Sequence, residues 1–134
     1  MGKATLVSQE LEGESKLISD GARLIESLDK SGFQVVAALW LYLSESDKWR
    51  LIIASPSEIV KGLRQAYIDI QSVLNNTSPP IKIPLQDISV VSPSDRLIQS
   101  LTGYISTESE IGGLRIQNSV FNNQFIEDAY IYRI

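Results

Sequence analysis

The sequence contains no cysteine and no histidine among its 134 residues. Without cysteine the chain cannot form a disulfide, a zinc–thiolate site or a thiolate nucleophile. Without histidine it cannot build a Ser-His-Asp triad, and it lacks the commonest general base and transition-metal ligand. Hard cations such as Mg²⁺, which carboxylate oxygens bind, remain compatible with the composition. We therefore predict no cofactor and no metal site.

Positive charge is scarce and scattered along the chain. Twelve Lys and Arg residues stand against 16 Asp and Glu residues, which gives a net charge of −4. Nowhere are three basic residues consecutive. Because proteins that bind phosphate backbones need clustered Lys and Arg, this pattern argues against nucleic-acid binding.

Long hydrophobic stretches are missing as well. The longest apolar stretch, residues 35–43, has the length of a strand, whereas a membrane-spanning helix needs about 18 apolar residues or more. The N-terminus lacks the hydrophobic region of a signal peptide. A chain without disulfides also suits a reducing compartment. We predict a cytoplasmic protein that does not enter a membrane.

The residues that are present predict a single α+β domain over residues 1–134. Hydrophobic residues make up 43% of the chain and charged residues 21%, which is ordinary for a domain with a packed core. Periodicity and turn residues predict a mixed sheet of about five strands with three helices, in the order α-β-β-α-β-α-β-β. The helices are expected over 14–30, 56–74 and 93–105, and the strands over 33–43, 49–54, 87–91, 114–121 and 124–134. We expect residues 1–13 to be flexible, because Gly13 weakens the helical pattern that extends into them.

A short Ser-Pro-Ser-acid phrase occurs twice, at residues 55–58 and 92–95. Each copy follows a short apolar stretch and opens a predicted helix. The first serine can accept a hydrogen bond from a backbone N–H of the first turn, and proline fits the first helical position. The acidic residue can bond back to the cap. We interpret both phrases as helix caps.

An anion site is the alternative interpretation of the two phrases. If the strands before them are parallel neighbours, both helix N-termini lie at one edge of the sheet, where their serines would meet a small molecule or a nucleotide. The serines concerned are Ser55, Ser57, Ser92 and Ser94. The acidic residue of each phrase would repel a phosphate, and neither phrase has the glycines of a phosphate-binding loop.

Acidic residues are paired in three places: Glu45 with Asp47, Glu108 with Glu110, and Glu127 with Asp128. The first two pairs fall in predicted polar loops, and we expect them to be solvated. Because no residue supplies an activated nucleophile or a tuned base, we name no catalytic residue. An enzyme with carboxylate-held Mg²⁺ stays an alternative function.

The last two strands are predicted to form a hairpin about Asn122 and Asn123. Asparagine tolerates the positive φ of a two-residue hairpin turn. This turn places Arg115 opposite Tyr130, and a shift of one residue would move every side chain to the other face. One face is then apolar and is expected to hold Leu114, Ile116, Val120, Phe125, Ala129 and Ile131.

The other face of this hairpin gathers Arg and Tyr side chains, and the first hairpin alternates Trp, Tyr and Arg with aliphatic residues. If these rows share one sheet face, they concentrate the residue types that dominate protein–protein binding sites. Structural packing and an Arg–Asp ion pair are the alternative. We predict a non-enzymatic module that binds a protein partner or a second copy, through a face not sealed within the monomer's core. The predicted binding residues are Trp40, Tyr42, Arg50, Arg115, Asp128, Tyr130 and Tyr132.

Three phrases together resemble a known family: residues 37–42 (AALWLY), 49–56 (WRLIIASP) and 126–133 (IEDAYIYR). Over residues 15–134 the chain is similar to a family of small bacterial proteins to which no activity is assigned. The resemblance implies a bacterial, cytoplasmic, stand-alone domain. It implies no catalytic residue.

Overall fold

The computed structural model describes residues 7–105 and 112–134. Its elements follow the predicted order α-β-β-α-β-α-β-β, with two short helices in place of the second predicted helix. In chain order they are α2 (Val7–Ser31), β1 (Ala37–Leu43), β2 (Lys48–Ala54), α3 (Ser57–Val60), α4 (Leu63–Asn75), the 3₁₀ turn η1 (Leu85–Asp87), β3 (Ile88–Val91), α5 (Arg96–Thr102), β4 (Leu114–Phe121) and β5 (Gln124–Arg133).

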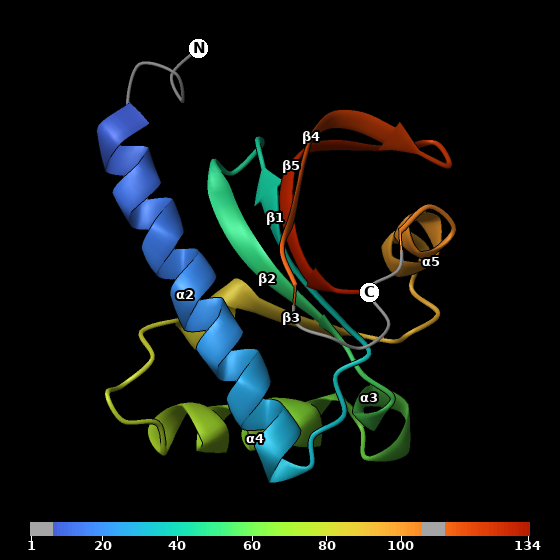
Figure 1. Cartoon of the computed structure of the whole chain (residues 1–134). Helices are drawn as coiled ribbons and strands as arrows, with labels where there is room; N and C mark the ends of the chain where they lie inside the picture. The colour runs from blue at the N-terminus through green and yellow to red at the C-terminus, as the bar shows by residue number, and fades with distance from the viewer. Residues whose placement is uncertain (1–6, 106–111) are drawn as a thin grey trace.

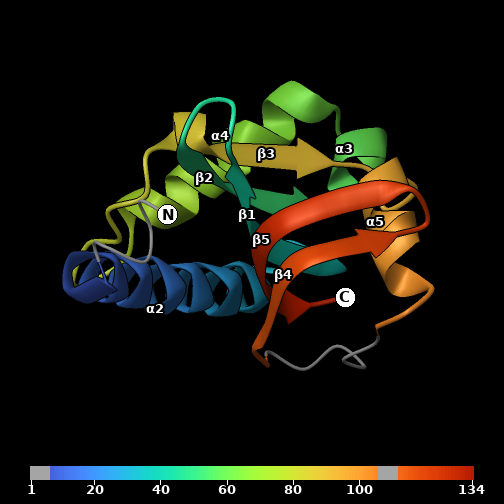
Figure 2. The same cartoon turned by 90° about the horizontal axis from the view of Figure 1, so that it is seen from above.

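The strands form one mixed sheet with the order β3-β2-β1-β5-β4. Strands β2 and β3 are parallel, and the other neighbouring pairs are antiparallel. Helices α2 and α4 cover one face, and α5 lies against the other (Figures 1 and 2). The predicted α+β class and the five-stranded mixed sheet are therefore confirmed.

The hydrophobic core is divided in two by the sheet. Leu24, Ile25 and Leu28 of α2 pack with α4 on one face. Ile98 and Leu101 of α5 pack on the other face. Strand β1 is the middle strand and contributes buried residues to both clusters, which explains why its sequence is apolar at nearly every position.

Helix α2 begins earlier than predicted. It runs through Gly13 from Val7, because one glycine costs a helix only about 1 kcal/mol. Residues 7–13 of the segment that we expect to be flexible are thus part of α2, and residues 1–6 lie outside the described residues. The helix ends as predicted at Gly32, whose φ is 87°. Within the described part of the chain, no helix is both long and apolar enough to cross a membrane.

The second predicted helix is broken in two. Gly62, with φ 92°, separates α3 from α4. Only α4 turns an apolar stripe into the core, through Ala66, Ile70 and Leu74. Ile59, which belongs to the same predicted helix, is exposed on α3. A glycine in the left-handed region changes the helix direction, so the stripe does not continue through it.

The two Ser-Pro-Ser phrases form turns that precede the helices. The hydroxyl of Ser55 accepts a hydrogen bond from the backbone N–H of Ser57, and Ser92 binds Ser94 in the same way, both at 3.1 Å. Helix α5 starts three residues later than predicted, and its cap is Asp95, whose carboxylate accepts from the N–H of Leu97. The prediction that the first serine is the N-cap was therefore wrong for α5. In α3 the N-cap position is Pro56, which makes no side-chain cap hydrogen bond.

The register of the last hairpin is confirmed. Arg115 lies opposite Tyr130, and Asn122 and Asn123 form the turn with φ of 49° and 68°. Leu114, predicted in the apolar core face, is 41% exposed at the start of β4. The predicted sorting of the faces also fails beyond Asn118, which has φ 48°. A residue in the left-handed region of φ interrupts the alternation of side chains between the two faces of a strand. As a result Val120 and Phe125, predicted in the apolar core face, are each 63% exposed, while Ile126 and Phe121 pack against the core.

Candidate functional site

Most of the predicted binding residues share the sheet face that α2 covers. Trp40 is paired with Tyr130 across β1 and β5, and Arg115 is paired with Tyr130 across β4 and β5. The residues brought together are Trp40, Tyr42, Arg115, Asp128, Tyr130 and Tyr132.

Arg50 does not belong to this group. Its side chain lies on the opposite face, where Nη1 donates to the carbonyl oxygen of Gln86 at 3.1 Å and to the hydroxyl of Ser89 at 3.0 Å. The neighbouring residue Trp49 lies on the face where Arg50 was predicted. The signal was available, because Trp49 lies directly opposite Tyr42 in the β1–β2 hairpin.

Tyr132 and Trp40 are sealed beneath α2. The Tyr132 hydroxyl donates to the carbonyl oxygen of Ile18 at 2.7 Å. Trp40 Nε1 donates to the carbonyl oxygen of Leu17 at 3.0 Å and to the Tyr132 hydroxyl at 2.9 Å. Tyr132 is only 1% exposed. The prediction that this face lies outside the monomer's own core was therefore wrong for Tyr132 and Trp40.

A glycine lets α2 approach these two side chains. A Cβ atom on Gly21 would lie 2.8 Å from Trp40 Nε1 and closer still to the Tyr132 hydroxyl. No side chain fits in that space. Burial raises the pKa of the Tyr132 hydroxyl above its ordinary value, and the hydrogen bond from Trp40 opposes part of that rise.

Four side chains of the same face keep part of their surface in solvent: Tyr42, Trp49, Arg115 and Tyr130. We call them the Trp49–Arg115 surface. The rings of Tyr42 and Trp49 are 5.4 Å apart, and the guanidinium carbon of Arg115 lies 5.6 Å from the centre of the Trp49 ring. This distance suits a cation–π contact. The four residues come from β1, β2, β4 and β5.

Arg115 is fixed by a buried carboxylate. Its Nε and Nη2 donate to the two oxygens of Asp128 at 2.5 and 2.7 Å, and Asp128 is 1% exposed. Gln117 also donates to Asp128, at 3.4 Å. The remaining nitrogen, Nη1, donates to Glu14 of α2 at 3.2 Å. The hydrogen bonds and charge of Asp128 raise the pKa of Arg115 above its ordinary value.

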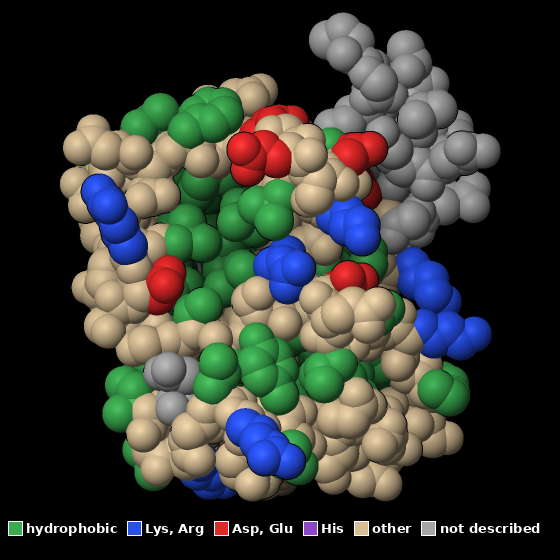
Figure 3. Space-filling view, turned by 180° about the vertical axis from the view of Figure 1, so that it is seen from behind, with side chains coloured by type: hydrophobic (Ala, Val, Ile, Leu, Met, Phe, Trp, Pro, Cys, Tyr) green, Lys and Arg blue, Asp and Glu red, His purple; other side chains and the backbone are tan. Residues whose placement is uncertain are grey.

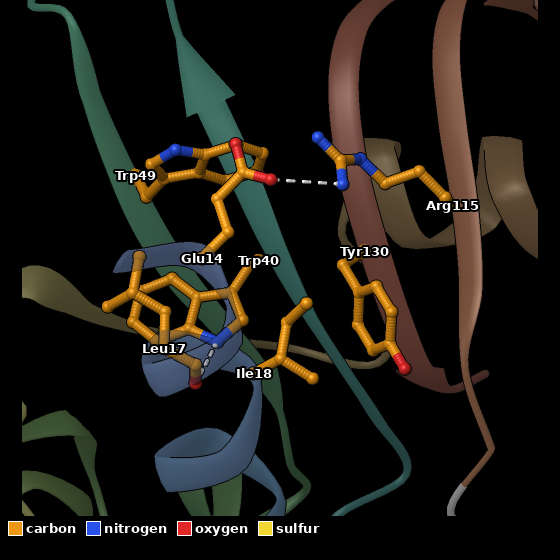
Figure 4. A pocket seen from close by; sticks show the side chains of 7 residues that line it. All are labelled: Glu14, Leu17, Ile18, Trp40, Trp49, Arg115 and Tyr130. Atoms are coloured by element: carbon orange, nitrogen blue, oxygen red, sulfur yellow. Dashed lines mark hydrogen bonds and ion pairs between the residues drawn. The ribbon is translucent and has the colours of Figure 1, made fainter. Parts of the chain in front are cut away.

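A small cavity lies between α2 and this surface (Figure 4). Its volume is about 10 Å³, room for about one water molecule. Glu14 extends toward Arg115, and Leu17 and Ile18 contribute apolar side chains to the lining. The cavity as it stands does not admit a small-molecule substrate, which needs several hundred cubic ångströms (about 300 Å³ or more).

A larger open groove of about 590 Å³ runs between the C-terminal halves of α2 and α4. Two cations line it. Arg23 donates to the carbonyl oxygen of Pro79 at 2.5 Å, and Lys30 pairs with Glu26 at 3.7 Å. Both therefore have partners within the chain, and the groove offers no fixed, convergent set of polar groups of the kind that ligand pockets use.

The strand arrangement required by the predicted anion site is present, but the serine hydroxyls are not arranged to bind an anion. Parallel pairing of β2 and β3 places Ser55 and Ser92 at one edge of the sheet, as the alternative required. Ser55 is buried, and both hydroxyls are held by backbone N–H groups, as described above for the two turns. Asp95 occupies the N-terminus of α5, where an anion would have to bind.

The three carboxylate pairs are not assembled into a metal site in the described part of the chain. Within it, no group of three or more acidic side chains is placed to hold a metal ion. Asp47 accepts a hydrogen bond from Tyr42, and Asp128 is engaged by Arg115. Glu108 and Glu110 lie outside the described residues.

Exposed aliphatic side chains form a second surface. Ile59, Val60 and Leu63 are exposed in the region where α3 meets α4. On the face opposite to that of Figure 1, hydrophobic side chains gather in a hollow (Figure 3). Apolar atoms make up more than half of most protein surfaces. We therefore give more weight to the Trp49–Arg115 surface, where an arginine is held in one orientation.

Comparison with protein-family models, with curated proteins and with solved structures found no match. The resemblance to a bacterial family therefore stays a prediction.

Proposed function

We propose that this protein is a non-enzymatic binding module that recognises a protein partner, or a second copy of itself, through the Trp49–Arg115 surface. The observation that supports the proposal is the position of Arg115. Its guanidinium is held by Asp128 beside the Trp49 ring, and its side chain is still 35% exposed. Arg, Tyr and Trp are the residue types that contribute most to protein–protein binding.

The fixed geometry favours binding in a second way. A flexible arginine loses rotamer freedom when it meets a partner, which weakens the complex. Here the two hydrogen bonds to Asp128 have already removed that freedom. The aromatic side chains of Tyr42 and Trp49 have few rotatable bonds and therefore lose little conformational entropy on binding.

The surface lacks the groups that catalysis needs. Among its described residues, the ionisable groups are one arginine and the carboxylates of Asp128 and Glu14 that pair with it, together with tyrosine hydroxyls. Among the described residues, the Tyr42 hydroxyl donates to Asp47, but this contact is exposed and provides no buried base that would activate a nucleophile. We keep the cytoplasm as the proposed location, because the chain has no cysteine to form the disulfides typical of oxidising compartments.

A double variant tests the proposal. Tyr42→Ala with Trp49→Ala removes the partly exposed aromatic pair, and we expect the protein to stay folded and to lose binding by about tenfold or more, because two binding side chains are truncated. Self-association is measured by sedimentation velocity over a concentration series. Partner binding is measured by quantitative comparison of the proteins that purify with wild type and with the variant.

Tyr104→Ala is the matched control. Tyr104 is an exposed aromatic residue that contacts Phe121, away from the Trp49–Arg115 surface. This variant should bind like wild type. If the double variant is folded by circular dichroism and keeps every interaction of wild type, the proposal is wrong. Tyr42→Ser alone replaces the double variant if that protein does not fold.

A further inference from the structure

The guanidinium of Arg115 binds two carboxylates, which differ in the number of hydrogen bonds that they accept. Asp128 is buried and takes Nε and Nη2 together, at 2.5 and 2.7 Å. Glu14 takes only Nη1, through one contact of 3.2 Å. A buried bidentate pair holds its geometry more strongly than a single ion-pair contact does. Asp128 therefore positions the arginine, and Glu14 is the partner that can be exchanged.

Glu14 is also free of the contacts that hold α2 on the sheet. The carbonyl oxygens of Leu17 and Ile18 receive the Trp40 and Tyr132 hydrogen bonds. Glu14 lies one helical turn before them. Its side chain can leave Arg115 by rotating about its own bonds, and the helix keeps its attachment to the sheet.

The space that Glu14 occupies is suited to a carboxylate. On one side is Arg115, and on the other are the ring of Trp49 and the aliphatic side chains of Leu17 and Ile18 (Figure 4). An acidic side chain has the same two parts, a charged end for the guanidinium and a short apolar stem for the aliphatic surface. With Glu14 in place the remaining cavity is about 10 Å³, so an incoming carboxylate must replace it.

We propose that Arg115 and Trp49 form a carboxylate-binding subsite that Glu14 fills in the free protein, and that a carboxylate of the bound partner displaces Glu14. The inference rests on the proposed function, because it names the chemistry by which the Trp49–Arg115 surface recognises its partner. Charge complementarity selects this occupant: once Glu14 leaves, Nη1 of Arg115 is a fixed donor without an acceptor.

Three small probes test the subsite. Acetyl-glutamate amide carries only a side-chain carboxylate, acetyl-alanine carries only a main-chain carboxylate, and acetyl-glutamine amide is neutral. The readout is the indole N–H signal of each tryptophan in NMR spectra. Trp49 lies at the subsite, and the Trp40 N–H signal reports whether α2 stays attached to the sheet, because this N–H donates to Leu17 and Tyr132.

The variant Glu14→Ala opens the subsite. We expect at least one carboxylate probe to shift the Trp49 signal saturably in this variant, while wild type needs a several-fold higher concentration and the neutral probe shifts nothing. A response to acetyl-glutamate amide alone identifies an acidic side chain as the ligand, and a response to acetyl-alanine alone identifies a chain terminus. Glu26→Ala, on an exposed position of the same helix, should respond like wild type.

Two results would overturn the inference: no Trp49 shift in Glu14→Ala with either carboxylate, or an equal shift with the neutral probe. Glu14→Gln, which keeps the side-chain length, repeats the test if Glu14→Ala disturbs the Trp40 signal. The proposed function fails separately. If the Tyr42/Trp49 double variant loses its partner but no carboxylate binds, only the subsite is wrong. If carboxylates bind but the double variant keeps every interaction, the binding-module proposal is wrong.

Discussion

At the scale of single residues, the polar atoms of aromatic side chains decide how α2 meets the sheet. The helix carbonyls of Leu17 and Ile18 have lone pairs left after their helical hydrogen bonds. Trp40 Nε1 and the Tyr132 hydroxyl bind these lone pairs. Gly21 provides the space for both. The buried aromatic residues thus meet their hydrogen-bonding needs within the chain, as buried polar groups must.

Tyr132 should make stability depend on alkaline pH. An unfolded tyrosine has a pKa of about 10, and burial raises the pKa of the folded one. The stabilisation is therefore fully present below pH about 10 and is lost as pH rises from there through the folded pKa. Urea unfolding at increasing pH should show a steeper alkaline loss for wild type than for Tyr132→Phe. Tyr104→Phe, changed at an exposed position, should follow wild type, and parallel curves for all three would contradict the assignment.

The same residues show the limit of a sequence pattern. Alternation placed Tyr130 and Tyr132 correctly on one face of β5, together with Arg115 across the strand pair. It could not show that this face is the one beneath α2. A strand pattern gives the face of a side chain, whereas the layer that covers that face depends on contacts between distant segments. Tyr132 was for that reason predicted at a surface and found in the core.

At the scale of elements, local turn chemistry was the reliable signal. The Asn122–Asn123 turn fixes the hairpin register, because both residues adopt the positive φ that a two-residue turn requires. Gly32 ends α2 for a related reason. The sequence contains no comparable indication at Asn118, because an asparagine within a strand pattern does not by itself predict a left-handed conformation. Its φ of 48° is what moves Val120 and Phe125 to the surface.

The cap of α5 gives a prediction at this scale. Asp95 accepts from the N–H of Leu97, so Asp95→Ala should destabilise the protein by about 1 kcal/mol, a usual cost for losing an N-cap. Ser92→Ala should cost less, because Ser92 supports only the exposed turn before the helix. The urea midpoints of both variants are compared with wild type. If Ser92→Ala lowers the urea midpoint more than Asp95→Ala does, Ser92 and not Asp95 is the effective cap of α5.

At the scale of the whole molecule, the first and last described elements, α2 and β5, are joined by an ion pair. Arg133, near the end of β5, donates to both carboxylate oxygens of Asp29 in α2 at 3.0 and 2.7 Å, and to the carbonyl oxygen of Val35 at 2.9 Å. These contacts close the layer between α2 and the sheet at the end opposite Glu14 and Arg115. Helix α2 is therefore held by the Asp29–Arg133 ion pair near its C-terminus and by the buried hydrogen bonds of Trp40 and Tyr132.

Breaking this tie tests how strongly it holds the fold. Arg133 is buried, and its Nε has no hydrogen-bond partner among the described residues, so its charge is poorly compensated once Asp29 is removed. Because the Asp29 side chain is 38% exposed, we expect Asp29→Ala to cost about 2 kcal/mol, less than the loss of a fully buried pair. The double variant Asp29→Ala, Arg133→Met removes the uncompensated charge and keeps most of the buried volume. It should therefore recover part of the stability in urea unfolding. If the double variant is less stable than Asp29→Ala, the arginine contributes more through Val35 and its packing than through the ion pair, and the tie between α2 and β5 does not depend on charge.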